Sequence, residues 1–181
     1  MRYAAFGGHL EIVKACKEWG ATDFNLTMTS AASGGHLEIV KVCKEWGATD
    51  FDEAMVLAAE GGHFEIVKAC KKWGASDFDK AMMEAAGSGH LEIVKACFIW
   101  GATNLDEAME VAARGGHHRM VKLCMEWSVN VIDCSSCGRG IDLSIKSLLT
   151  EKEEKLWRKI VEEMVHDIPR SCDNCKFLLL K

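Results

Sequence analysis

GGHLEIVKVCKEWGATDF, from Gly34 to Phe51, decides the fold of this 181-residue chain because it recurs almost unchanged along the sequence. The same histidine, cysteine and tryptophan return every 27 residues. The three series are His9, His36, His63, His90 and His117; Cys16, Cys43, Cys70, Cys97 and Cys124; and Trp19, Trp46, Trp73, Trp100 and Trp127. Three series that share one period indicate an internal repeat.

Each repeat reads as two helices joined by a tight turn. In the unit from Phe51 to Asp77, the first helix, FDEAMVLAA, ends at the glycine pair Gly61-Gly62. The second helix, HFEIVKACKKW, ends at Gly74, a residue suited to the left-handed position that follows a helix. The sequence therefore predicts a shorter first unit and four full ones. Their ranges are 1–23, 24–50, 51–77, 78–104 and 105–131.

The first helix has one side whose residues repeat and another whose residues differ between units. With the starting aromatic as place one, the repeated places are one, five, eight and nine, as in Phe51, Met55, Ala58 and Ala59. At about 100° per residue these share one arc, so we expect that arc to face the core. Places three, six, seven and ten should face outward, and three of them, places three, six and ten, supply the candidate binding residues. These are Glu53, Lys80 and Glu107; Val56, Met83 and Glu110; and Glu60 and Arg114.

The recurring His, Cys and Trp are interpreted as structural residues. Stacked helices lie about 8–10 Å apart, whereas zinc needs ligand atoms at about 2.0–2.3 Å and a disulfide needs Cα atoms within about 7 Å. We expect the cysteines to be small buried core residues and the histidines to hydrogen-bond the turn that enters the second helix. We expect each tryptophan ring to pack on the next unit. The alternatives are metal ligands for the first two series and a binding stripe for the third.

The repeat resembles an ankyrin repeat. GGHLEIVKACKEWGA, residues 7–21, matches the second-helix segment of that family, and AMVLAA, residues 54–59, matches the end of its first helix. The resemblance covers roughly residues 1–131, but the period is 27 residues instead of about 33. The β-hairpin finger and the threonine-proline start are missing, and this short form looks like the ankyrin arrays of large DNA viruses. The resemblance implies protein recognition by the helices and turns.

Two places break the pattern. In the fourth unit, Phe98 and Ile99 replace the Lys44-Glu45 pair of the second. Either the C-terminal segment covers these apolar residues or they contact a partner. At the other end, Met1 aligns with Met55, so the first unit has no N-terminal cap. Either the chain is a shortened descendant of a longer array, or another chain covers this end in a homo-oligomer or larger assembly.

The repeat stops at residue 131, and residues 132–181 are expected to form a small capping unit. Two C-x-x-C pairs flank a helix that begins with the capping box of Thr150 and Glu153. Thiolates with this spacing suit a closed tetrahedral Zn²⁺ site, which would be structural because no ligand position stays open. A metal would also stabilise a segment with a thin core. The alternatives are free thiols or a redox pair. The four predicted ligands are Cys134, Cys137, Cys172 and Cys175.

Composition excludes several classes of function. The net charge is −5, with 13 basic and 18 acidic residues over 1–131 and nine of each over 132–181. Such a balance opposes nucleic-acid binding, which needs a basic face. No apolar run approaches the roughly 18 residues of a membrane span. The start MRYAAFGGH has no signal-peptide pattern, and nine cysteines is an odd number, so we expect a reducing intracellular compartment.

Together these patterns predict an all-α, ankyrin-like solenoid of helix-turn-helix repeats without fingers, closed by a zinc-stapled helical unit. No catalytic constellation is present, because the recurring histidines occur in every unit, unlike a single active site. We expect a non-enzymatic module that binds a protein partner, in the cytoplasm or, for a viral protein, in the host cytoplasm or virion. The alternative function is a structural component of an assembly such as a virion, with its N-terminal end buried by a neighbouring subunit.

Overall fold

The structure, a computed structural model, describes residues 1–130 and shows ten α-helices and no strand within that range. They form five pairs, one for each unit that the sequence predicts. The helices are α1 (Arg2–Phe6), α2 (Leu10–Glu18), α3 (Phe24–Ser33), α4 (Leu37–Glu45), α5 (Phe51–Glu60), α6 (Phe64–Lys72), α7 (Phe78–Gly87), α8 (Leu91–Trp100), α9 (Leu105–Arg114) and α10 (His118–Asn130). Within residues 1–130, the predictions of an all-helical fold and of two helices in each repeat are confirmed.

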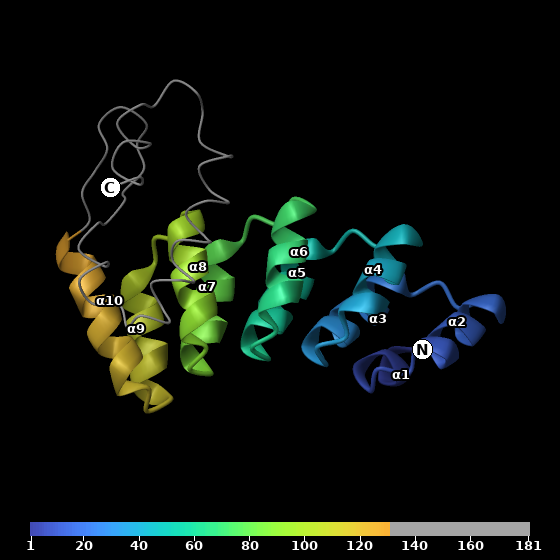
Figure 1. Cartoon of the computed structure of the whole chain (residues 1–181), viewed down its shortest axis with the longest axis horizontal. Coiled ribbons are helices and arrows are strands. Elements are labelled where there is room, and N and C mark those ends of the chain that lie inside the picture. Colours follow the sequence, from blue (N-terminus) through green and yellow to red (C-terminus); the bar gives the residue numbers. More distant parts are fainter. Residues whose placement is uncertain (131–181) are drawn as a thin grey trace, which may run out of the picture.

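The pairs stand side by side in a row, with their turns aligned (Figure 1). Each first helix packs on its own second helix and on the first helix of the next pair, as α5 does on α6 and α7. The second helices touch one another much less. The odd-numbered helices α1 to α9 therefore form one continuous layer, and the even-numbered helices α2 to α10 form the other.

The core lies mainly along the odd-numbered helices. Met55, Ala58 and Ala59 are fully buried, as the repeated places predict, and Met28 and Met82 are their buried equivalents in α3 and α7. The alanines allow neighbouring first helices to approach closely, while each methionine fills the space between them. Because one unit exposes this apolar arc until a neighbour covers it, the units stabilise one another.

The tandem glycines and the histidine join one unit to the next. Gly62 has φ +77°, a left-handed conformation that favours glycine. A Cβ on Gly62 would also lie 2.5 Å from Cε1 of His90 in the next unit. The His90 Nε2 donates a hydrogen bond to the Glu60 carbonyl oxygen at 3.0 Å. The other bonds of this series join His36 to Phe6 at 2.9 Å, His63 to Ser33 at 3.1 Å and His117 to Gly87 at 2.9 Å.

The histidine bonds a turn that enters a second helix, but this turn belongs to the preceding unit. The acceptor is a carbonyl 30 residues earlier, at the end of the preceding first helix. That carbonyl belongs to the last turn of a helix and has no intrahelical donor. The ring reaches it by lying against the neighbouring glycines, where a side chain would obstruct it.

The tryptophans of the three middle units pack on their own and the preceding unit, contrary to the prediction that they pack on the next one. The Trp73 and Phe51 rings lie 5.7 Å apart between centroids, and the Lys44 Nζ of the preceding unit lies 5.3 Å above the Trp73 ring. Aromatic and cation–π contacts of this kind each contribute about 0.5–1.5 kcal/mol. The same contacts recur around Trp46, with Phe24 and Lys17, and around Trp100, with Phe78 and Lys71.

No helix within residues 1–130 is long and apolar enough to cross a membrane. The predicted capping unit, residues 132–181, lies outside the described residues.

Replacing Gly62 with alanine should destabilise the protein more than replacing Gly74. Both glycines have positive φ, which costs a non-glycine residue about 1–2 kcal/mol. Only the Cβ at Gly62 would also collide with the His90 ring; at Gly74 no described atom lies within 4 Å of it. We expect Gly62→Ala to lower the free energy of unfolding in urea by about 1–3 kcal/mol more than Gly74→Ala. Equal losses would contradict the role assigned to the His90 ring.

Candidate functional site

The odd-numbered helices α5, α7 and α9 present an exposed, mostly acidic surface. Glu53, Lys80 and Glu107 at place three are exposed, as predicted, and so are the place-ten residues Glu60 and Arg114. Glu110 at place six is exposed and pairs with Arg114 at 3.3 Å. We name this surface the acidic face. It consists of Glu53, Glu60, Lys80, Glu84, Glu107, Glu110 and Arg114.

Place six is covered in most units, contrary to its predicted outward orientation. Val56 is only 3 % exposed and belongs to the core, so it is no part of the acidic face. Thr29, its equivalent in α3, is also buried, and Met83 is half-buried. A first helix has another first helix on each side, which widens its buried arc beyond the arc of a helix that packs on a single neighbour.

The apolar pair in the fourth unit has a partner within the described residues. The Phe98 ring stacks on Trp127 of α10, with centroids 4.6 Å apart and an interplanar angle of 5°. Phe98 and Ile99 are both half-buried. Phe98 therefore joins α8 to α10. The sequence left two alternatives for this pair: that the C-terminal segment covers it, or that it contacts a partner. Both stay predictions.

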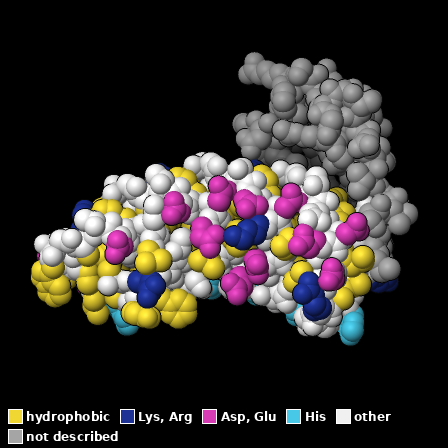
Figure 2. Space-filling model, turned by 180° about the vertical axis from the view of Figure 1, so that it is seen from behind, with side chains coloured by type: hydrophobic (Ala, Val, Ile, Leu, Met, Phe, Trp, Pro, Cys, Tyr) yellow, Lys and Arg dark blue, Asp and Glu magenta, His cyan; other side chains and the backbone are white. Residues whose placement is uncertain are grey.

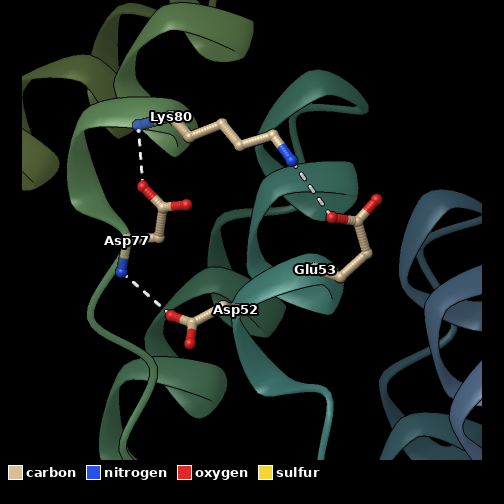
Figure 3. A network of polar contacts seen from close by, with 4 residues as sticks. All are labelled: Asp52, Glu53, Asp77 and Lys80. Atoms are coloured by element: carbon tan, nitrogen blue, oxygen red, sulfur yellow. Dashed lines mark hydrogen bonds and ion pairs between the residues drawn. The ribbon is translucent and has the colours of Figure 1, made fainter.

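A network of polar contacts crosses from α5 to α7 (Figure 3). The Lys80 Nζ donates to Glu53 Oε2 at 3.2 Å, and the Lys80 backbone N–H donates to Asp77 Oδ1 at 3.3 Å. The hydrogen bond to Glu53, together with its charge, raises the pKa of the Lys80 ammonium above its ordinary value. Both side chains are about half exposed, so water screens the pair and its contribution to stability is small.

The carboxylate at place two has a function that the sequence pattern did not reveal. Asp52 Oδ1 accepts hydrogen bonds from the backbone N–H groups of Ser76 at 2.6 Å and Asp77 at 2.9 Å. These groups lie in the turn that leads to α7, so Asp52 fixes where the next unit begins. Asn25 and Asp79 make the same pair of bonds in the units from 24 and 78. The sequence signal for this role is an Asp or Asn that lies 24 residues before the first bonded residue of each turn.

Charge is divided between the two layers of helices. Helices α5, α7 and α9 hold eight acidic and two basic residues, a net charge of −6. Helices α2, α4, α6 and α8 hold six acidic and eight basic residues, a net charge of +2. Figure 2 shows acidic side chains gathered over the middle of one side of the molecule, with hydrophobic ones at the end away from the grey atoms. The first helices of the last three units thus concentrate the negative charge of the described helices.

The recurring cysteines behave as core residues, as predicted. Cys43, Cys70, Cys97 and Cys124 are buried, and Cys16 in the first unit is half-buried. Desolvation raises the pKa of Cys43 and Cys124 to about 11 and that of Cys70 and Cys97 to about 12. A thiol with so high a pKa is a poor nucleophile and a poor metal ligand at neutral pH. Within residues 1–130, no group of three or more His, Cys, Asp or Glu could hold a metal ion.

The four predicted zinc ligands, Cys134, Cys137, Cys172 and Cys175, lie outside the described residues. A scan against family models and a search of curated proteins both find no match for this chain. The functional argument therefore rests on the geometry and charge of the described residues.

Asp52→Ala should destabilise the junction between α5 and α7, whereas Asp52→Asn should be tolerated. Alanine leaves two backbone N–H groups without their acceptor, and loss of a comparable capping oxygen costs about 0.5–2 kcal/mol. Asparagine keeps the amide oxygen that Asn25 already uses for the equivalent bonds. The measurement is the free energy of unfolding in urea for both variants. Losses of equal size in the two would mean that the charge of Asp52, and not its acceptor oxygen, fixes the turn.

The buried thiols should resist alkylation until the protein unfolds. With a pKa of about 11 to 12, Cys43, Cys70 and Cys97 stay protonated at mildly alkaline pH in the folded state, whereas unfolded thiols ionise near pH 8.5. Because the folded pKa is the higher one, the free energy of unfolding should also fall as pH rises through that window. Iodoacetamide labelling with peptide mapping, with and without urea, measures this protection. Rapid labelling of Cys70 in the folded protein would contradict its burial.

Proposed function

We propose that this protein is a non-enzymatic module, an ankyrin-like solenoid, that binds a protein partner through the acidic face. The observation that carries the proposal is that the buried residues of the first helices repeat from unit to unit, whereas the exposed residues differ. The buried places repeat, with Met55 and Met82 as examples, whereas place three changes from Glu53 to Lys80 to Glu107. Stacking requires the first set alone, so the second set is free to encode recognition.

The charge of the face favours a partner with a basic surface. A net charge of −6 on three adjacent helices creates a negative potential that attracts Lys- and Arg-rich surfaces and repels nucleic acid. Most of these carboxylates are exposed, so they would increase the association rate more than the final affinity. Half-buried Met83 and the aliphatic stems of Lys80 and Arg114 add apolar contact area between the charges.

A second candidate function is a structural component of a larger assembly, such as a virion. Trp19 and Ile12, in the first unit, are 82 % and 52 % exposed, which favours a neighbouring subunit at that end.

Charge reversal on the acidic face should slow and weaken partner binding without unfolding the protein. The immobilised wild-type chain should capture basic proteins at low salt. The double variant Glu60→Lys with Glu110→Lys should capture less of them. The matched control is Glu45→Lys with Glu92→Lys, which makes the same charge change at exposed positions of α4 and α8. Captured proteins are quantified by mass spectrometry, and the affinity for each purified partner is then measured by calorimetry. Equal affinities for the two double variants would rule out the acidic face as the binding surface.

A further inference from the structure

Helix α8 is covered on the side that faces away from the core. Its Lys95 is 8 % exposed and its Ala96 is 0 % exposed. At the equivalent places of α4, Lys41 is exposed and Val42 is half-buried. An additional layer of atoms therefore lies on α8 and not on α4.

The same side of α8 also departs from the repeat in sequence. Ile99 stands where α4 has Glu45 and α6 has Lys72. Because Ile99 follows Lys95 by four residues, both lie on one side of the helix. Ile99 is half-buried, whereas Glu45 and Lys72 are exposed. We name the surface made by Lys95, Ala96 and Ile99 the outer face of α8.

The neighbouring helices do not account for this cover. Helices α6 and α10 stand on either side of α8 in the row, and α7 packs on its core side (Figure 1). Helix α4 has the equivalent neighbours α2, α6 and α3, and its Lys41 stays exposed. The Trp127 ring of α10 stacks on Phe98, which lies beside the outer face and not on it. The row of helices alone would therefore leave the outer face of α8 open.

We propose that residues 150–165 of this chain pack along the outer face of α8 as an amphipathic helix. These residues lie outside the described range, and their sequence fits the surface. Apolar residues stand at 156, 157, 160, 161, 164 and 165, which places them on one side of a helix. This apolar side covers Ala96 and Ile99 and removes both from water.

Charge favours residues 150–165 over the other apolar stretches that follow α10. A lysine is almost never fully buried unless it is paired, so the atoms that cover Lys95 must include an anion. Glu153 precedes Leu156 by three residues, which brings a carboxylate to the apolar side of the proposed helix. The apolar stretches 143–149 and 177–180 contain no acidic residue. Only residues 150–165 thus combine an apolar side with a carboxylate on that side.

The chain is long enough for this contact. Helix α10 ends at Asn130, beside α8 in the row, and residues 131–149 link it to Thr150. Stacked helices lie about 8–10 Å apart, and an extended chain spans about 3.3 Å per residue. The linker therefore reaches α8 without strain, and the contact needs no second chain.

Acetylation of lysines in the full chain, under reducing conditions and mapped by mass spectrometry, tests the proposal. We expect Lys95 to react about tenfold more slowly than Lys41, because the covering helix must first open locally. The ratio should be the same from low to high micromolar protein. Ile160→Glu, which places a charge within the apolar side of the covering helix, should bring the rate at Lys95 close to that at Lys41.

The matched control is Lys155→Glu, which introduces the same residue on the opposite side of the proposed helix and should leave Lys95 protected. Cys70 is buried in the repeat core, so its resistance to iodoacetamide reports that the repeats stay folded in both variants. A loss of protection at Lys95 with Cys70 still protected is the expected result for Ile160→Glu.

Three results would overturn the proposal. Equal rates at Lys95 and Lys41 in the wild type would mean that the outer face is open. Protection that fades on dilution would assign the cover to a second copy. Protection that persists in Ile160→Glu would assign it to another segment. The outer face of α8 shares no residue with the acidic face, so loss of partner binding in the Glu60→Lys, Glu110→Lys variant leaves this test unaffected.

Discussion

The hydrogen bond from the repeat histidine of each unit after the first to a carbonyl of the preceding unit is the contact on which the rest of the structure depends. The His63 ring lies between Gly35 of the preceding unit and Gly61 of its own, and its Nε2 donates to the Ser33 carbonyl oxygen. One side chain thus satisfies an orphaned helix-end acceptor and sets the distance between two units. In the first four units, the glycine before the histidine is fixed by its left-handed φ and by the histidine ring of the next unit. Ser88, one position earlier, shows that a small side chain fits there.

These hydrogen bonds therefore join neighbouring units. This explains which parts of the fold could be predicted from the sequence. The helix bounds, the methionine and alanine core and the buried cysteines follow from periodicity, because each depends only on position within a unit. Periodicity does not tell whether a recurring polar residue serves its own unit or its neighbour. The acceptor of His90 lies 30 residues before it, and the donors to Asp52 lie 24 and 25 residues after it. Neither partner could be identified from the repeat pattern for that reason.

The sequence likewise predicted some residues of the candidate site correctly and others wrongly. Places three and ten lie at the edge of the first-helix layer, so Glu53 and Glu60 are exposed as a single helix would predict. Place six lies where two first helices meet, which covers Val56 and Thr29. A helical wheel drawn for one helix contains no information about the second neighbour. The charge of the face could be counted from the sequence, but its concentration in one layer follows from the row of helices.

Nearest-neighbour packing also separates the two surfaces that remain for partners. A side chain on the flank of the layer, such as that of Glu60, can change without altering any junction, so selection for binding acts there at little cost in stability. At the end of the row, Trp19 is the residue type that packs between units elsewhere, because the repeat has a tryptophan at this position in every unit. The acidic flank is therefore suited to a partner of different chemistry. Because the two surfaces use different residues on different units, occupation of one leaves the contacts of the other in place.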